Sequence, residues 1–588
     1  MTESFVNPSD AEVASNDRTP EVRDHRVKPD LRYIWRLTKA YLKRDAKVGW
    51  SLVGLKLAFT IAGSLIILAF QYKLAGATNA LSAKDAAALW PNISLATGLI
   101  VLIFAVALLN VIVDYTLRMR MRTVYTDDFL GRWLGANRFY HLERRGGVDH
   151  PEQRVQEDIY NYVQLFVSLA PTILGTVVNV VLYSGTLWTL SKPVSLKFIG
   201  LPWTVHGYLP FIAMAAGIGM TMIVHYIGDA LTKAEITRQR LEAQFRNDMT
   251  GVRENAEMVA FEKGAAMEGV KLDAIFDLIR KNWRRYTFAQ ARLSAVLGLP
   301  ALILTVAPMA LCAPLVLDGR MGVGDLQLVG SAFLMMYSSV SVLATSYSDI
   351  AILRAAVARM RLFDEALDKP AESGIEVSQS AQHVMSTRDL ALRLPDGAPL
   401  VDVGNLQLKA GDRLLVRGPS GAGKSTLMRA LAGLWPFGSG LVEIPEGKRI
   451  CFLPQRSYMP DGTLASLLTY PKAPDPARDS EYVAVLNSLG LGALASRLHQ
   501  HDQWRQILSP GEQQRLAAAR ALLAKPDFLF LDEASSALDP RSETTLYTLL
   551  DEQLPHAALV SVAHRPDVAR FHRDVLSIEE GKSVLSEI

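Results

Sequence analysis

The sequence predicts a membrane domain of six α-helices followed by an α/β domain built around a phosphate-binding loop. Three observations support this fold class. Six apolar runs lie between residues 48 and 347. From about Ala366 onward the chain becomes more polar, and strand-like segments alternate with helix-like ones. Within this second part, the glycine-rich segment Gly418–Thr426 stands between an apolar strand and a helix, where it can cradle phosphates.

The overall composition fits such a chain. The protein has 588 residues, of which 49% are hydrophobic and 21% are charged, and its mean hydropathy is +0.15. This much apolar mass excludes a disordered protein, and the length excludes a single small module. The two cysteines, Cys312 and Cys451, match no metal or disulfide spacing. A net charge of +3 gives no sign of nucleic-acid binding, and we expect no nucleic-acid partner.

Each apolar run is close to the ~20 residues that a helix needs to cross the bilayer core. Buried helices of a large soluble protein are the alternative, but six such runs in one half of a chain favour membrane spans. The predicted spans cover residues 48–72, 92–115, 164–188, 208–228, 292–317 and 324–347.

The basic residues that flank the spans predict the orientation. Segments 29–47 and 117–162 are rich in Arg and Lys, whereas the opposite loops, 73–91 and 189–207, hold few. Because basic loops stay on the cytoplasmic side, both termini and the second domain should be cytoplasmic. Residues 1–28 are polar, carry no signal-peptide pattern and should form a disordered cytoplasmic tail.

These features give a domain plan. The membrane domain should occupy residues 29–366, a polar linker residues 367–383, and the nucleotide-binding domain residues 384–588. The stretches 116–163 and 229–291 read as helical, so we expect long cytoplasmic extensions of the spans.

The segment Gly418–Thr426 has the pattern G-x-x-x-x-G-K-[ST]. Its glycines let backbone N–H groups face phosphates, and the N-terminus of the following helix adds positive potential. Lys424 should neutralise the β- and γ-phosphates of a nucleotide, and Ser425 can bind Mg²⁺. The nucleotide-binding residues predicted here are Gly418, Ser420, Gly421, Ala422, Gly423, Lys424, Ser425 and Thr426.

Two acidic residues follow an unbroken apolar run, Phe528–Leu531. Such a run is typical of a buried parallel strand, and ligands bind at the carboxyl ends of these strands. Asp532 is placed to hold Mg²⁺, and Glu533 to act as the general base that polarises the attacking water. The alternative is an ordinary strand that ends in two surface acids.

The motifs around this strand resemble those of ATP-binding cassette (ABC) transporters. Leu508–Arg515 (LSPGEQQR) resembles the signature motif, in which Ser509, Gly511 and Glu512 would contact ATP. Gln455 resembles the Q-loop glutamine that senses Mg²⁺, Asp539 belongs to a D-loop-like SALD, and His564 resembles the switch histidine. The resemblance implies ATP and Mg²⁺ as cofactors, Gln455 as a further metal ligand, and an exporter-like, type IV membrane domain. It also implies Glu533, His564 and Gln455 as the catalytic residues.

Two departures from the family pattern stand out. Signature position three is Pro510 instead of the usual glycine, and position five is Glu512 instead of glutamine. Proline offers no N–H, so the phosphate cradle would rely on Ser509 and the Gly511 amide. In addition, residues 388–400 contain no aromatic side chain that could stack on adenine.

The variant motifs resemble one branch of the family, which holds peroxisomal acyl-CoA transporters (subfamily D) and bacterial BacA/SbmA-related proteins. The segment Asp149–Ile159 and the region 242–261 resemble the same branch. The resemblance implies an ATP-driven transporter of the bacterial inner membrane that imports hydrophilic or peptide-like compounds, such as antimicrobial peptides or cobalamin-like solutes. A transporter of lipids or acyl-CoA-type amphiphiles is the first alternative, and a non-transporting membrane regulator is the second.

One cassette and six predicted spans make half of a transporter. In the family, ATP binds between the P-loop of one cassette and the signature of another, so we expect a homodimer with two equivalent sites.

Four ionisable residues lie in or near the spans and are candidates for contact with the transported solute: Lys56, Asp114, His225 and Asp349.

Overall fold

The computed structural model describes residues 30–145, 148–191, 194–195, 204–342, 346–369 and 374–588, so the predicted tail 1–28 lies outside the described residues. By their contacts the residues form two compact units. Unit 1 lies within residues 1–136 and 148–367, and unit 2 combines residues 137–147 with residues 368–588.

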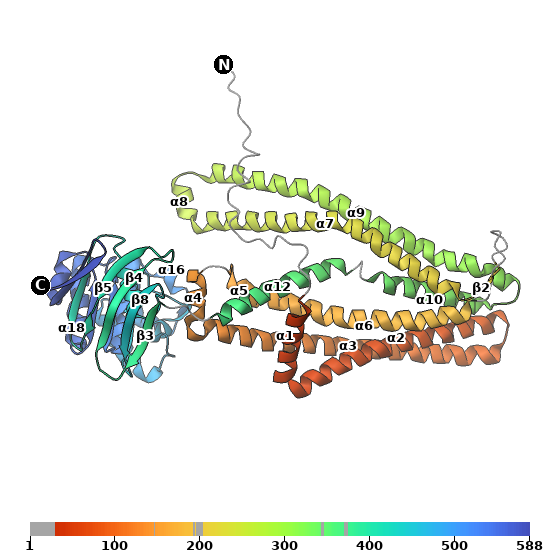
Figure 1. Ribbon diagram of the computed structural model, residues 1–588, viewed down its shortest axis with the longest axis horizontal. Coiled ribbons are helices and arrows are strands. Elements are labelled where there is room, and N and C mark those ends of the chain that lie inside the picture. The colour runs from red at the N-terminus through yellow and green to blue at the C-terminus, as the bar shows by residue number, and fades with distance from the viewer. Residues whose placement is uncertain (1–29, 146–147, 192–193, 196–203, 343–345, 370–373) are drawn as a thin grey trace, which may run out of the picture. The chain divides into compact units, whose positions relative to one another are not determined.

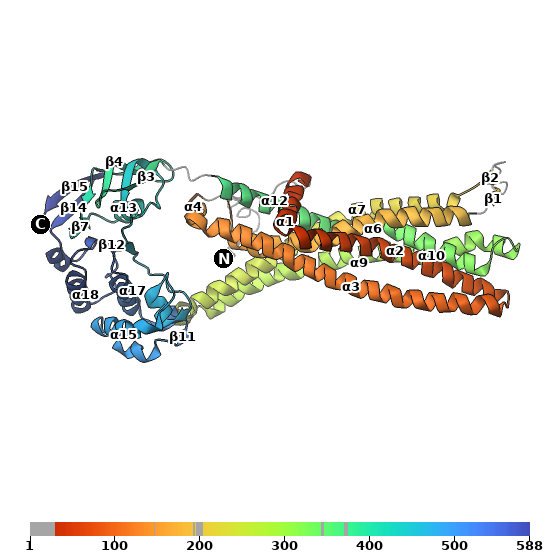
Figure 2. The same ribbon diagram turned by 90° about the horizontal axis from the view of Figure 1, so that it is seen from below.

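Unit 1 is a bundle of long helices (Figures 1 and 2). Helix α2 packs along α3, α7 packs along α9, and α10 contacts α2, α6, α7 and α9. The helices are α1 (Leu31–Arg44), α2 (Ala46–Ser82), α3 (Ala86–Leu134), α5 (Pro151–Gln153), α6 (Ile159–Leu190), α7 (Tyr208–Glu254), α8 (Ala256–Phe261), α9 (Ala265–Leu317), α10 (Val323–Val340) and α12 (Tyr347–Asp368).

Five helical segments among the described residues are long and apolar enough to cross a membrane: Ala46–Ser82, Ala86–Arg144, Pro151–Leu190, Tyr208–Gly228 and Ala265–Leu317. They contain the first five predicted spans. Helix α10 covers most of the sixth, 324–347, but is not among the five, because Asp325 and Gln327 make it more polar. Residues 343–345 of that span lie outside the described residues, and the sixth crossing stays a prediction.

The polar start of α10 pairs with the end of α2. The Asn79 side chain donates a hydrogen bond to Asp325 at 3.0 Å and accepts one from the Gly324 N–H at 2.7 Å. The Thr78 hydroxyl lies 2.9 Å from the Gln327 amide oxygen. These bonds satisfy polar groups that would otherwise be costly beside apolar helices.

Two buried carboxylates, Asp364 and Asp158, tie helices of unit 1 together. Asp364 in α12 accepts hydrogen bonds from the guanidinium groups of Arg36 in α1 and Arg132 in α3. Asp158, which precedes α6, is held by Arg154 and by Arg359 of α12. Each buried carboxylate therefore faces two guanidinium groups, which offset its loss of water and leave one positive charge over.

Unit 2 contains a sheet of eleven strands in the order β3-β8-β4-β5-β15-β14-β7-β13-β12-β9, with β6 beside β4. Strands β14, β7, β13, β12 and β9 run parallel to one another, and β15 pairs with β14 in the antiparallel direction. The strands are β3 (Ile375–Ser380), β4 (Met385–Arg393), β5 (Pro399–Gly404), β6 (Gln407–Leu408), β7 (Arg413–Arg417), β8 (Gly438–Pro445), β9 (Ile450–Leu453), β12 (Phe528–Asp532), β13 (Ala558–Val562), β14 (Asp574–Glu579) and β15 (Lys582–Glu587).

Helices pack beside this sheet, and β10 (Gly462–Thr463) and β11 (His501–Asp502) form a separate two-stranded antiparallel sheet. The helices of unit 2 are α4 (Arg138–Arg145), α13 (Lys424–Leu431), α14 (Leu464–Thr469), α15 (Asp479–Ser488), α16 (Trp504–Ile507), α17 (Pro510–Ala524) and α18 (Pro540–Gln553).

Two features of unit 2 differ from the domain plan. Residues 375–380, which we expected in the linker 367–383, form β3, because they pair in parallel with β8 and Ile375 is buried. Residues 137–147, which we assigned to the membrane domain, group with unit 2. In that segment the guanidinium group of Arg144 lies 5.9 Å from the Trp435 ring centre.

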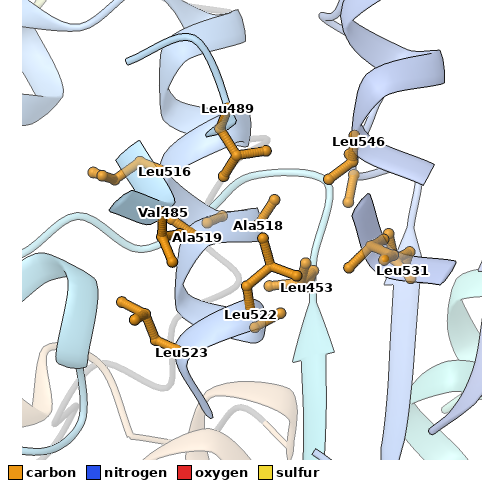
Figure 3. Packing of buried hydrophobic residues seen from close by; sticks show 14 of the residues in the cluster. Leu453, Val485, Leu489, Leu516, Ala518, Ala519, Leu522, Leu523, Leu531 and Leu546 are labelled. Carbon is orange, nitrogen blue, oxygen red and sulfur yellow. The ribbon is translucent and has the colours of Figure 1, made fainter. Parts of the chain in front are cut away.

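One of the two main apolar clusters of unit 2 forms around α17 (Figure 3). Leu516, Ala519 and Leu522 of this helix face Leu453 of β9 and Leu489, which follows α15. The cluster fixes α17, which carries the signature motif at its start, against the end of β9.

Removing apolar volume from this cluster should destabilise unit 2. Leu516 is fully buried, so Leu516→Ala should lower the free energy of unfolding by about 2–5 kcal/mol. The urea midpoint of the full-length protein in detergent measures this loss. Leu585→Ala is the matched control, because Leu585 is 56% exposed. Equal midpoints for the two variants would contradict the packing described here.

Candidate nucleotide site

The P-loop leads from β7 into α13. Gly421 and Gly423 adopt φ angles of +82° and +98°, which residues with a side chain rarely adopt. A Cβ atom on Gly423 would also lie 3.1 Å from the Leu400 side chain. Ser420 and Gly421 are exposed, so the loop opens to solvent where a phosphate can enter.

Lys424 and Thr426 begin α13, and both are buried. The Lys424 ammonium group donates hydrogen bonds to the backbone oxygens of Gly418 and Pro419, at 2.8 and 2.9 Å. The Lys424 ammonium group therefore lies over the P-loop, which includes Gly418 and Ala422. Phosphate oxygens are stronger acceptors than these neutral carbonyls, so Lys424 is poised to exchange them for a nucleotide.

Ser425 and Asp532 meet across the site. The Ser425 hydroxyl donates a hydrogen bond of 2.8 Å to Asp532 at the end of β12. Burial raises the pKa of Asp532, and the Ser425 hydrogen bond opposes that shift. A hydroxyl and a carboxylate side by side are the hard oxygen ligands that Mg²⁺ prefers, so the residues present fit the ion.

Glu533 is held between two other predicted residues. Its carboxylate accepts a hydrogen bond from the Gln455 amide at 2.9 Å and lies 3.1 Å from Nε2 of His564. The backbone of Glu533 has a φ of +51°, an uncommon angle for a residue with a side chain, and such angles concentrate at functional sites. The structure therefore brings the three predicted catalytic residues together.

The signature residues form a helix cap. Ser509 is the N-cap of α17, and the Glu512 carboxylate accepts hydrogen bonds from the Ser509 N–H at 2.9 Å and hydroxyl at 2.8 Å. The bond from the backbone N–H of Ser509, followed by that from its hydroxyl, lowers the pKa of Glu512. Pro510 occupies the first turn of α17, where a missing N–H costs the helix nothing.

The other predicted ligands lie apart from the P-loop. Asp539 caps α18 by accepting hydrogen bonds from the N–H groups of Arg541 and Ser542. The Ser542 hydroxyl is the main cause of the lowered pKa of Asp539. No hydrogen bond or ion pair among the described residues joins Ser509, Gly511 or Asp539 to the P-loop of the same chain.

One residue of this region has a contact that the sequence did not reveal. Gln514 is buried and donates to the Ser536 hydroxyl at 3.2 Å, while its amide oxygen accepts from the Ala537 N–H at 2.9 Å. It thereby ties the signature helix to the segment before Asp539. The sequence signal for this contact is a glutamine one turn inside a helix at a buried position. Buried amide groups are hydrogen-bonded, so such a glutamine should have partners.

Comparison with known proteins identifies the chain. Residues 37–317 match the family "ABC transporter transmembrane region 2", and residues 401–536 match "ABC transporter". An ABC transporter ATP-binding protein of Synechocystis, sll0182, is 32% identical over 566 residues, which are 92% of this chain and 82% of the relative. The chain is an ABC transporter with fused membrane and ATP-binding domains.

Other relatives are more distant. The human lysosomal cobalamin transporter ABCD4 is 27% identical, over 74% of this chain and 75% of that protein. The structure of a bacterial Atm1-family ABC exporter with ATP bound has the same fold, with a TM-score of 0.71 at 19% identity. It covers 93% of this chain, and this chain covers 95% of it. The transporter thus has an ATPase domain that binds and hydrolyses ATP to drive transport, in an exporter-like fold.

The four candidate solute-contacting residues in the membrane domain of the transporter do not lie together in one described site. Lys56 and Asp114 form an ion pair at 2.7 Å. Asp349 is exposed near the start of α12. The side chain of His225 lies outside the described residues.

The geometry around Glu533 generates a prediction for the transporter. Glu533→Gln keeps the size of the side chain but removes the basic carboxylate, so hydrolysis should fall by at least about 100-fold. ATP binding should persist, because the P-loop is untouched. Phosphate release and retained ³²P-ATP measure the two effects.

Glu552→Gln makes the same chemical change at an exposed position of α18 and serves as the control. A Glu533→Gln variant that hydrolyses ATP as fast as this control would exclude Glu533 as the base.

Proposed function

We propose that the transporter is a homodimer of the bacterial inner membrane that imports hydrophilic or peptide-like solutes. The polar lining of a cavity in unit 1 carries this proposal. Lys56, Asp114, Arg118 and Asn110 line a space of about 550 Å³ among α2, α3, α6 and α10, together with Ser and Thr hydroxyls. A charged and hydroxyl-lined cavity suits a hydrophilic solute better than an acyl chain, which gains from apolar contact.

Two likenesses support the proposal further. The name of the human relative gives its solute as cobalamin, a large hydrophilic compound. The import direction rests on the resemblance of the motifs to the bacterial BacA/SbmA-related branch, and the cytoplasmic position of both termini rests on the basic segments 29–47 and 117–162.

We assign the chemistry of hydrolysis to residues at the ends of the parallel strands. Lys424 leaves the carbonyls of its own loop and binds the β- and γ-phosphate oxygens. Glu533 accepts a proton from the water that attacks the γ-phosphorus, while the bond to the bridging oxygen breaks and ADP leaves. His564 and Gln455 hold the Glu533 carboxylate in place for this step.

The same site would hold Mg²⁺ on Ser425 and Asp532, with Gln455 as a further ligand. When bound, the ion would neutralise charge on the phosphate oxygens.

A second copy of the chain is needed to complete each site. Ser509, Gly511 and Asp539 make no described contact with the P-loop of their own chain, so these groups are available to a nucleotide held by the partner.

The tip formed by α8 and the start of α9 exposes four apolar side chains, Met258, Phe261, Met267 and Val270, which are 60–80% exposed in the single chain. We assign the second copy as the partner that covers this tip, because apolar side chains gathered at one place mark an interface.

Mixed dimers test the shared sites. Two tagged copies are co-expressed, one with Lys424→Ala and the other with Ser509→Arg. One composite site then has both lesions and the other has none, so about one ATP per dimer should be retained after desalting. When both substitutions are in one copy and the other is wild type, each site has one lesion and no ATP should be retained. The same retention in both arrangements would contradict shared sites.

Uptake tests the transported class. Cells with the wild-type transporter should accumulate radiolabelled cobalamin or a labelled hydrophilic peptide, and cells with Glu533→Gln should not. Glu552→Gln should behave as the wild type. Uptake that survives in Glu533→Gln would reject ATP-driven import. Transport of labelled acyl-CoA in its place would support the amphiphile alternative, and ATPase activity that no solute changes would support a regulator.

A further inference from the structure

The cavity in unit 1 has an unbalanced charge. Among the described residues that line it, the charged side chains are Lys56 of α2 and Asp114 and Arg118 of α3. Lys56 lies 2.7 Å from one carboxylate oxygen of Asp114, and Arg118 lies 2.6 Å from the other. All three side chains are less than 20% exposed. Two cations thus share one anion, which leaves one positive charge.

A surplus positive charge on side chains with so little exposure to water costs free energy unless an anion binds beside it. Ionisable groups within membrane segments pair with one another or mark the path of a solute. The Asp114 carboxylate engages both cations, and Arg118 also donates to the Gln164 side-chain oxygen. Donor groups of both cations still remain for a further acceptor. A carboxylate carries the single negative charge that would balance the cluster, whereas a phosphate monoester carries about −1.5 to −2 at neutral pH.

The rest of the wall offers acceptors. The hydroxyls of Thr60 and Thr172 donate to backbone oxygens of their own helices, at 2.9 and 2.8 Å. Their oxygens therefore face the cavity as acceptors, which suits N–H or O–H donors on a solute.

The volume sets the size of that solute. The cavity of about 550 Å³ lies within the range of about 300–1,000 Å³ that is typical of small-molecule sites. It lies among four helices that run side by side in Figure 1, α2, α3, α6 and α10.

We propose that this cavity binds the carboxylate of a hydrophilic, donor-bearing solute such as a short peptide, and that Asp114 is its internal competitor. Lys56 and Arg118 hold the solute carboxylate, and the hydroxyl oxygens of Thr60 and Thr172 accept from its amide N–H groups. When the site is empty, Asp114 neutralises part of the cationic charge. The proposal rests on the proposed function, because it names the class of solute for the same cavity.

Binding of a matched peptide pair tests this site. The probes are a radiolabelled N-acetyl-Ala-Ser-Gly with a free carboxylate and the same peptide as its C-terminal amide. Equilibrium dialysis against the wild-type transporter in lipid nanodiscs, without nucleotide, measures both dissociation constants. The acid should bind at least about tenfold more tightly than the amide, since a hydrogen bond to a charged group outweighs a neutral one by that factor.

Two variants separate a binding role from a structural one. Lys56→Met should weaken binding of the acid about tenfold, whereas Asp114→Asn should tighten it, because the competing carboxylate is gone. A merely structural ion pair would make both variants weaken binding. Lys47→Met, an exposed position of the same helix, is the matched control and should bind as the wild type does.

Three results would overturn the proposal: equal binding of acid and amide, no binding of either, or a shift in the same direction in both variants. The measurement needs neither hydrolysis nor transport. A transporter that prefers the acid but shows no ATP-dependent uptake would reject the proposed function and leave this site standing, and uptake without the preference would do the reverse.

Discussion

The nucleotide site depends on the parallel register of four strands. Strands β7, β13, β12 and β9 lie in that order, and all run the same way. Their carboxyl ends therefore meet at one edge of the sheet. The P-loop follows β7, His564 follows β13, Glu533 follows β12 and Gln455 follows β9. A shift of β9, β12 or β13 would separate Glu533 from Gln455 or His564, so the buried apolar pairs of these strands indirectly set the geometry of the reaction.

Much of this site was predictable because its signals are local. A P-loop, a buried strand that ends in two acids and a capped signature helix each need fewer than ten residues to be recognised. What the sequence could not provide depends on partners far along the chain. Gln514 reaches Ser536 and Ala537 more than twenty residues away, and the pairing of Lys56 with Asp114 depends on how two helices rotate about their axes. Strand β3 was missed because it is mostly exposed and is held by its pairing with β8, about 65 residues further along the chain.

In the membrane domain, each of three carboxylates with little exposure to water faces two cations. Asp364 and Asp158 each face two guanidinium groups away from the cavity, where they join helices of the bundle. The Lys56–Asp114–Arg118 cluster differs because its members line an open space, whose surface is about half polar and half apolar. An ion cluster that served only to join helices would gain nothing from lining a cavity. Electrostatic interactions are stronger where the charged groups are fully buried and no open space adjoins them.

Helix α3 places this cluster on the same rigid element that leads to the ATPase unit. From Arg118 it continues without a break to Leu134, which is about 24 Å at 1.5 Å per residue. A short turn then leads into α4, whose contacts group it with the ATP-binding domain. A straight helix transmits a displacement over this length because its backbone hydrogen bonds resist bending. If nucleotide binding changes the affinity of the cavity for its solute, linkage requires the solute to change the affinity of the ATPase domain for nucleotide by the same factor.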